Sequence, residues 1–245
     1  MDKILLDVHT HTIASGHAFS TIQEMAKRAS ELGLDVLGIT DHAPTIPGAP
    51  NPLYFWNLYT IPRMMYGVRL LMGCELNILD TKGTLDLSEK YYKRMDIRIA
   101  GIHSLCYTPG TAEECTAGMI EAIKNPWTNI ISHPGDGTAD LIFEPIVLAA
   151  KENKTLLEIN NSSLFPYRKK ACAKPNNLEI LRLCKKYEVP VILGSDAHIS
   201  FSIADYKCIY PLLSEVEFPE GLIMNDKPKE FFDYLSIPET APTFI

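Results

Sequence analysis

Short apolar runs recur along this chain at intervals of about thirty residues, and most of them end on a histidine or an acidic residue. The closing residues are spaced by 31 residues from His11 to His42, by 33 to Glu75, by 28 to His103 and by 30 to His133. Each interval has the length of one strand and one helix. The spacing therefore predicts a repeating strand-helix architecture.

The next interval is twice as long. From His133 to Asp196 the chain runs 63 residues, which leaves room for one strand without a ligand, and residues 155–159 have the composition for it. The predicted strands are then residues 4–6, 36–39, 70–74, 97–102, 130–131, 155–159 and 191–194. Their apolar character on both faces is typical of parallel strands covered by helices. Seven such units predict a closed or nearly closed α/β barrel, in which functional side chains follow the C-terminal strand ends.

The composition predicts one globular domain. A chain of 245 residues can form one large core, so we expect a single domain over residues 1–237 and a surface tail at 238–245. We see no leader segment and no apolar stretch long enough to span a bilayer, and we expect a cytoplasmic protein without a membrane partner. The net charge of −7 argues against extended nucleic acid as a partner. The sequence does not decide whether the protein forms a homo-oligomer.

Local patterns predict several helices. Ser20 and Gln23 have the spacing of a capping box, which predicts a first helix that ends at Gly33. Apolar periodicity predicts further helices over residues 113–124, 143–152, 176–187 and 229–235. The segment 43–62 is rich in proline and aromatic residues and predicts a long loop, which either walls the substrate pocket or only packs over the strand ends.

All seven histidines belong to the polar motifs. His9 and His11 lie two residues apart on an extended segment, which places both imidazoles on one side, and Asp196 and His198 repeat this arrangement. The full set of candidate ligands is His9, His11, His17, His42, Glu75, His103, His133, Asp196 and His198. Nine groups exceed what one ion uses, so two or three metal ions are expected. Imidazole with carboxylate suits zinc, manganese or iron.

The six cysteines form no C-x-x-C pair and predict reduced thiols. Cys74 and Cys106 lie near candidate ligands, but a small buried side chain is the simpler interpretation. Neighbouring metal ions can activate a water and clamp a phosphoryl group, which favours hydrolysis. The chain has no Walker-type loop and no G-x-G-x-x-G motif, so nucleotide-driven transfer and dinucleotide redox chemistry lack support.

The motifs together resemble the PHP (polymerase and histidinol phosphatase) superfamily and, within it, the YcdX-like phosphatases. The resemblance rests on residues 7–12, 40–42, 73–75, 102–103, 132–134, 158–163 and 194–198, in family order along nearly the whole chain. It implies the PHP fold, a distorted seven-stranded (βα)7 TIM-like barrel. It also implies a site for three divalent metal ions, usually zinc, with manganese and iron as alternatives.

The resemblance assigns roles to the candidate ligands. The first ion would be held by His9, His11, Glu75 and Asp196, the second by the bridging Glu75 with His103 and His133, and the third by His17, His42 and His198. A hydroxide between the first two ions would attack phosphorus. Glu75 and Asp196 are thus the candidate catalytic residues, and Asp196 could help to orient the nucleophile.

Two sets of residues could assist this site. Arg168 matches an arginine of the YcdX-like proteins and could bind phosphate, with a solvated basic loop as the equal alternative. For Lys169 and Lys170 the solvated loop is the favoured interpretation. Asp7 and Asp41 each neighbour a ligand, and either fix imidazole tautomers or cap strand ends.

The leading hypothesis is a metal-dependent phosphoesterase, a phosphoric monoester hydrolase that acts on a small phosphorylated substrate. Three alternatives remain. One is a histidinol-phosphate phosphatase, and another is a phosphodiesterase or nuclease of the PHP type. The last is a PHP domain kept for structure, which we would expect to have lost ligands, whereas this chain retains all nine.

Overall fold

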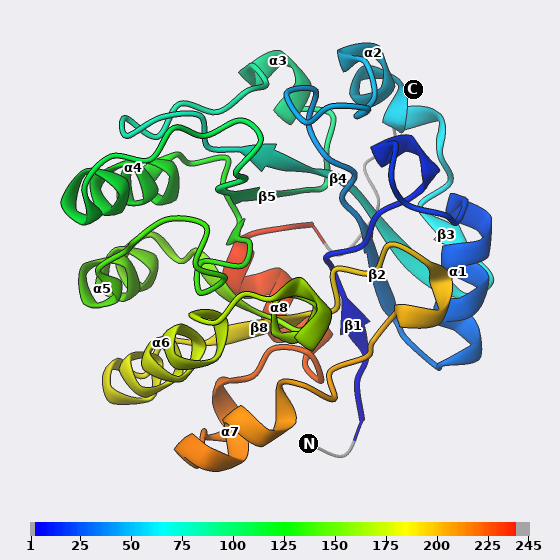
Figure 1. Ribbon diagram of the computed structural model, residues 1–245. Coiled ribbons are helices and arrows are strands. Elements are labelled where there is room, and N and C mark those ends of the chain that lie inside the picture. Colours follow the sequence, from blue (N-terminus) through cyan, green and yellow to red (C-terminus); the bar gives the residue numbers. More distant parts are fainter. Residues whose placement is uncertain (1–2, 239–245) are drawn as a thin grey trace.

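The computed structural model describes residues 3–238 and contains every predicted strand (Figure 1). Seven parallel strands follow one another in chain order around the sheet: β1 (Leu6–Asp7), β2 (Val36–Ile39), β4 (Val68–Asn77), β5 (Ile97–Gly101), β6 (Ile130–Ile131), β7 (Leu156–Asn160) and β8 (Val191–Gly194). A short strand, β3 (Met64–Met65), pairs antiparallel with β4. The single domain over residues 1–237 stays a prediction, and the predicted tail lies outside the described residues except for Pro238.

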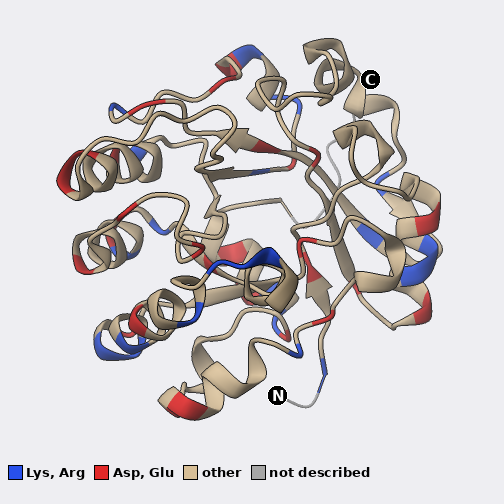
Figure 2. Ribbon diagram, viewed as in Figure 1, with Lys and Arg blue, Asp and Glu red and all other residues tan. Residues whose placement is uncertain are grey.

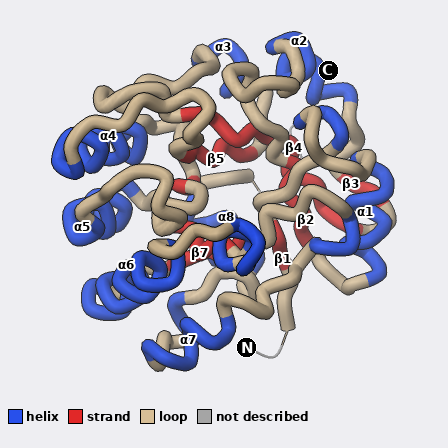
Figure 3. Tube along the Cα trace, viewed as in Figure 1, coloured by secondary structure: helices blue, strands red, loops and turns tan. Residues whose placement is uncertain are grey.

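Helices surround the strands (Figure 3). They are α1 (Ile22–Glu31), α2 (Pro52–Trp56), α3 (Glu89–Tyr92), α4 (Ala112–Lys124), α5 (Phe143–Asn153), α6 (Ala173–Tyr187), α7 (Tyr210–Val216) and α8 (Pro228–Leu235). The helices predicted from apolar periodicity are confirmed to within three residues. The largest deviation is in α6, which begins early because Pro175 falls in the first turn, where the missing N–H would have no partner. Among these described helices, none combines the length and apolar character that a bilayer span requires.

The segment 43–62 mainly packs against the barrel. It contains α2 and a short 3-10 turn. Its Phe55 and Leu58 side chains are buried in the hydrophobic core between the strands and the surrounding helices. Only Ile46 of this segment contributes to the pocket described below. Most of this loop therefore packs over the strand ends, which is the second of the two predicted roles. Its contribution to the pocket wall is limited to one side chain.

The N-cap of the first helix lies one residue after the predicted cap, Ser20. Thr21 is the N-cap: its hydroxyl accepts a hydrogen bond from the Glu24 amide at 3.3 Å, and its own amide donates to Glu24 Oε2 at 2.7 Å. Ser20 is buried instead, and its hydroxyl accepts a hydrogen bond from the Ser200 amide at 3.0 Å. The predicted Ser20–Gln23 box is wrong because Ser20 joins two strand-end loops, and because a carboxylate at residue 24 accepts hydrogen bonds better than the neighbouring amide side chain.

The barrel is nearly closed between its first and last strands. Beyond their C-terminal ends, Thr10 and Ala197 form an isolated parallel bridge. Lower down, the buried Asn225 side chain fills the gap: its Nδ2 donates to the carbonyls of Leu6 at 3.1 Å and Leu193 at 2.9 Å, and its Oδ1 accepts from the Leu193 amide at 2.8 Å. One amide side chain thus takes the place of direct backbone hydrogen bonds between β1 and β8 at this level. It satisfies backbone groups of both edge strands.

The interior of the barrel differs from one end to the other. Near the N-terminal strand ends it is apolar, and α8 packs Phe231 and Phe232 against strand residues such as Leu6 and Leu71; Figure 1 shows α8 behind the ring of strands. Because side chains alternate along a strand, the inner face of β4 passes from Leu71 through Gly73 to Glu75. The same alternation carries β7 from Leu156 to Glu158. The polar groups therefore gather at the C-terminal end.

Candidate metal centre

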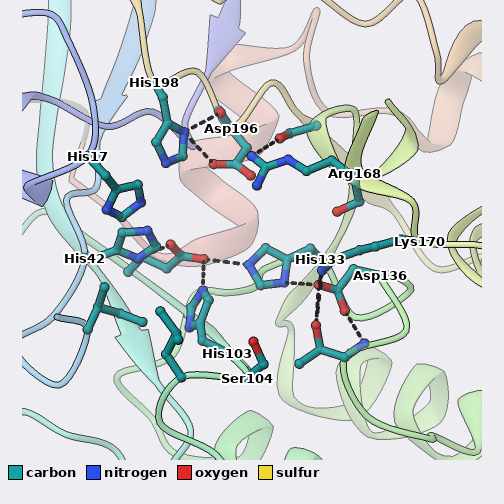
Figure 4. A pocket seen from close by; sticks show the side chains of 16 residues that line it. His17, His42, His103, Ser104, His133, Asp136, Arg168, Lys170, Asp196 and His198 are labelled. Carbon is teal, nitrogen blue, oxygen red and sulfur yellow. Dashed lines mark hydrogen bonds and ion pairs between the residues drawn. The ribbon is translucent and has the colours of Figure 1, made fainter. Parts of the chain in front are cut away.

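Glu75 lies in the middle of the predicted ligands and is fully buried. Its Oε1 atom is close to three imidazoles: His9 Nε2 at 3.4 Å, His103 Nε2 at 3.3 Å and His133 Nε2 at 2.9 Å. Its Oε2 atom is close to two more: His42 Nδ1 at 2.8 Å and His11 Nε2 at 3.5 Å. Five imidazoles from four strand ends thus surround one carboxylate, and Figure 4 shows three of them, those of His42, His103 and His133.

Asp196 forms a second acidic centre beside the first. Its Oδ1 atom lies 3.6 Å from His9 Nε2, 3.2 Å from His11 Nε2 and 3.4 Å from His198 Nδ1. Its backbone has a positive φ of 52°, a conformation uncommon for residues other than glycine, directly after β8. The backbone turns at this residue, and the side chains of residues 196 and 198 both point toward the cluster.

The nine candidates form one continuous cluster. In three groups all the donor atoms lie within 4.8 Å of one another: His9 with His11 and Asp196, His42 with Glu75 and His103, and His11 with His42 and His198. His133 joins the cluster through Glu75, and the His17 ring lies 5.0 Å from those of His42 and His198. The structure therefore brings all nine predicted ligands together.

The electrostatics of the cluster keep its carboxylates ionised. Burial by itself raises the pKa of Glu75, but the imidazoles of His9, His103 and His42 outweigh burial and hold that pKa well below its usual range. The pKa of Asp196 is lowered well below its usual range in the same way, against the effect of burial. Burial lowers the pKa of His103, yet Glu75 and, after it, Cys106 more than offset this and raise it to about 10. Ionised carboxylates are the form that binds a cation.

Two imidazole nitrogens that face away from Glu75, those of His9 and His11, have partners of their own. His9 Nδ1 lies 2.7 Å from Glu158 Oε1. His11 Nδ1 lies 3.1 Å from the Ser15 hydroxyl, which donates to Asp41 at 2.7 Å. Such partners fix the orientation and tautomer of metal-binding imidazoles.

Four acidic or hydroxyl side chains around the cluster bear on the sequence-based expectations. Asp41 supports a ligand through Ser15, whereas Asp7 accepts hydrogen bonds from the backbone amides of Ser195 and Ala204 and so anchors the chain after β8. The role of Glu158 was missed, although strand alternation from Leu156 would have placed it inside the barrel. Ser15 ends a single 3-10 turn, Ile13–Ser15, which is too short to leave a periodic pattern in the sequence.

A cavity of about 240 Å³ opens above the cluster. Besides the ligands it is lined by Ile46, Ser104, Leu105, Asp136, Thr138, Ser162, Ser163, Arg168 and Lys170. Arg168 and Lys170 enter from the side opposite His17 and His42 (Figure 4). Figure 2 shows the basic segment that carries them as a blue stretch at the barrel mouth.

The two cations of the pocket have different partners. Arg168 donates to the Ser162 hydroxyl at 2.9 Å. Lys170 contacts Asp136, whose Oδ2 lies 3.6 Å from His133 Nδ1. Lys170 is exposed, as the solvated loop predicts, but it also pairs with Asp136 and lines the cavity, whereas Lys169 does not line it.

Comparison with known sequences identifies the family. The PHP domain family profile matches residues 7–157. A probable phosphatase of Clostridium novyi is 48% identical over 233 residues, and one of Acetivibrio thermocellus is 46% identical over 233 residues. Both matches cover 95% of this chain and 95% of the relative. The chain therefore belongs to the PHP domain family, as the motifs predicted.

Solved structures share the fold. A histidinol phosphatase assigned in Listeria monocytogenes superposes with a TM-score of 0.61 at 20% identity, covering 84% of this chain and 99% of that one. The histidinol phosphate phosphatase of Lactococcus lactis, solved with zinc, L-histidinol and phosphate, gives a TM-score of 0.59 at 18% identity and covers 89% and 95%. The predicted PHP-type barrel is confirmed.

Proposed function

We propose that this chain is a metal-dependent phosphatase that hydrolyses a small phosphomonoester at a trinuclear metal site. The observation that carries the proposal is Glu75, whose two oxygens face separate sets of imidazoles at the base of an open pocket. The predicted enzyme class, a phosphoric monoester hydrolase, agrees with the relatives named probable phosphatases.

The donor set fits divalent metal ions. Glu75 Oε2, His42 Nδ1 and His103 Nε2 are buried without a well-directed hydrogen bond, although His42 Nδ1 and Glu75 Oε2 lie 2.8 Å apart. Donor atoms that converge in this way without bonding to one another suit coordination to a cation. Imidazole and carboxylate donors favour zinc, with manganese and iron as alternatives.

The ligand sets are proposed as the family resemblance implies them. His9, His11, Glu75 and Asp196 would hold the first ion, Glu75, His103 and His133 the second, and His17, His42 and His198 the third. The grouping of His9 with His11 and Asp196 supports the first set. His42 falls into two groups, one with Glu75 and His103 and one with His11 and His198, and the second of these supports its pairing with His198 in the third set.

Bound ions would lower the pKa of a water toward neutrality and neutralise phosphoryl oxygens. The protein's own groups would do the rest. Asp196, itself a member of the first ligand set, would also accept a hydrogen bond from the attacking water and orient it. Arg168 can donate two parallel hydrogen bonds to a phosphate, and it projects into the pocket from the side opposite His17 and His42.

The proposal is tested on protein purified without added metal, by elemental analysis beside hydrolysis of p-nitrophenyl phosphate. We expect two or three ions per chain and activity that a chelator abolishes. Fewer than two ions would contradict the polynuclear site. His103→Ala should lower both metal content and kcat, and its failure to change either would refute the proposed second site.

Histidinol phosphate, assayed beside the generic ester, separates the main alternative. A kcat/KM for histidinol phosphate far above that for generic esters would favour a histidinol-phosphate phosphatase. The cytoplasmic location and the oligomeric state stay predictions.

A further inference from the structure

Glu158 is a buried carboxylate to which the proposed reaction gives no role. It lies on the inner face of β7 and is 1% exposed. Its Oε1 lies 2.7 Å from His9 Nδ1, while its Oε2 accepts hydrogen bonds from the His133 amide at 2.7 Å and from Asn160 Nδ2 at 3.1 Å. A buried charge is retained only where such partners offset its desolvation.

The neighbouring strand leaves space for this carboxylate. A β-carbon at Gly194, on β8, would stand 1.6 Å from Glu158 Oε1. Any larger residue there would push the carboxylate off His9. The absence of a side chain at residue 194 and the presence of a carboxylate at residue 158 are therefore parts of one arrangement.

Glu158 reaches two ligands that the proposed function assigns to different ions. On one side it contacts the His9 ring, and on the other it holds the backbone of His133, which has a positive φ of 33°. His133 in turn places its Nε2 2.9 Å from Glu75. We infer that Glu158 is the positioning residue shared by the first and second metal sites, an inference that rests on the proposed function.

The chemistry of the contact sets the state of His9. An ionised carboxylate only accepts hydrogen bonds, so His9 Nδ1 must carry a proton. When the ring is neutral, its Nε2 lone pair is then free to coordinate an ion on the side of Glu75 and Asp196, which lie 3.4 and 3.6 Å away.

Glu158→Gln tests this inference with almost no change in volume. The amide oxygen must stay with its two donors, His133 N–H and Asn160 Nδ2, so the amide NH₂ would face His9 Nδ1 and donate to it. His9 would then carry its proton on Nε2, where it blocks coordination. We expect the variant to lose at least one ion per chain and kcat to fall about 10- to 100-fold, the usual cost of losing such a partner.

A second readout does not depend on activity. Long-range ¹H–¹⁵N NMR spectra of the metal-stripped protein, with His9 assigned from a His9→Gln variant, should show a proton on Nδ1 in the wild type and none in Glu158→Gln. Wild-type metal content together with a protonated Nδ1 in the variant would overturn the inference. If the wild type hydrolyses no phosphomonoester, the proposed function fails, while metal content and NMR still decide the role of Glu158.

Two further variants separate positioning from folding. Asp96 is a buried carboxylate remote from the site, and it binds Arg63 and the Met72 amide. Its replacement, Asp96→Asn, should leave the metal content per folded chain unchanged. Glu158→Asp keeps a carboxylate, but its side chain is too short to reach both His9 and His133. If Glu158→Gln does not fold, metal content of Glu158→Asp between one half and none of the wild-type value supports the inference, and wild-type content refutes it.

Discussion

The two ends of the barrel are built from the same strands but do different work. At the N-terminal end the inner face is apolar and sealed by Phe231 of α8, which is fully buried. At the C-terminal end the same strands present Glu75, Glu158 and the imidazoles. The comparison indicates that stability and chemistry are separated along the strands, so substitutions at the two ends should have separable effects.

The largest effect on stability is expected at the apolar end. Phe231→Ala removes a fully buried ring and should lower the free energy of unfolding by about 3–5 kcal/mol, because it leaves a cavity under the strands. Urea denaturation measures the loss. Metal content and kcat of the folded variant should stay at wild-type values, and a large fall in either would show that the two ends are coupled.

The largest effect on activity is expected at the polar end. Glu75→Gln replaces the carboxylate that five imidazoles face, and kcat should fall at least about 100-fold, because losing a ligand should cost no less than losing a ligand's partner. Metal analysis and phosphatase assays check this outcome. Glu179→Gln, an exposed residue on α6, is the matched control. A Glu75→Gln enzyme with full activity would remove Glu75 from the site.

A smaller effect is expected at the pocket wall. Arg168→Ala removes a cation from the cavity, and KM for a phosphomonoester should rise about 10-fold, the equivalent of one charge-assisted hydrogen bond. Lys169→Ala, next in sequence but outside this cavity, should leave KM unchanged. Equal effects of the two variants would mean that only the general charge of the loop matters.

The smallest effect is expected away from both ends. Thr21→Ala removes the N-cap of α1 and should cost about 1 kcal/mol of stability. Hydrogen exchange at the Glu24 amide should become faster. Ser20→Ala should leave that exchange rate unchanged, because Ser20 bonds to the Ser200 amide instead, and a faster rate would restore Ser20 as the cap.

The sequence predicted the polar end better than the way the barrel closes. The intervals between ligands gave the strand order, because each strand-helix unit has nearly the same length, and they placed all nine candidates at one end. The supporting contacts were harder to foresee. The alternation of side chains along β7 could have predicted that Glu158 faces the barrel interior. The contact of Ser15 depends on how the chain folds over Asp41, which the sequence does not indicate. Asn225 acts from an irregular segment, and no periodicity marks it.

The Asn225 closure also determines when the barrel can be completed during folding. Its side chain bonds the carbonyl of Leu6, 219 residues earlier in the chain, so the first strand gains this partner only after nearly the whole protein has been synthesised. Contacts of such long sequence separation form late and slow folding, because the entropy of closing the loop is lost before the contact forms. A chain that stops before residue 225 would leave two strand edges exposed, and exposed edges promote aggregation.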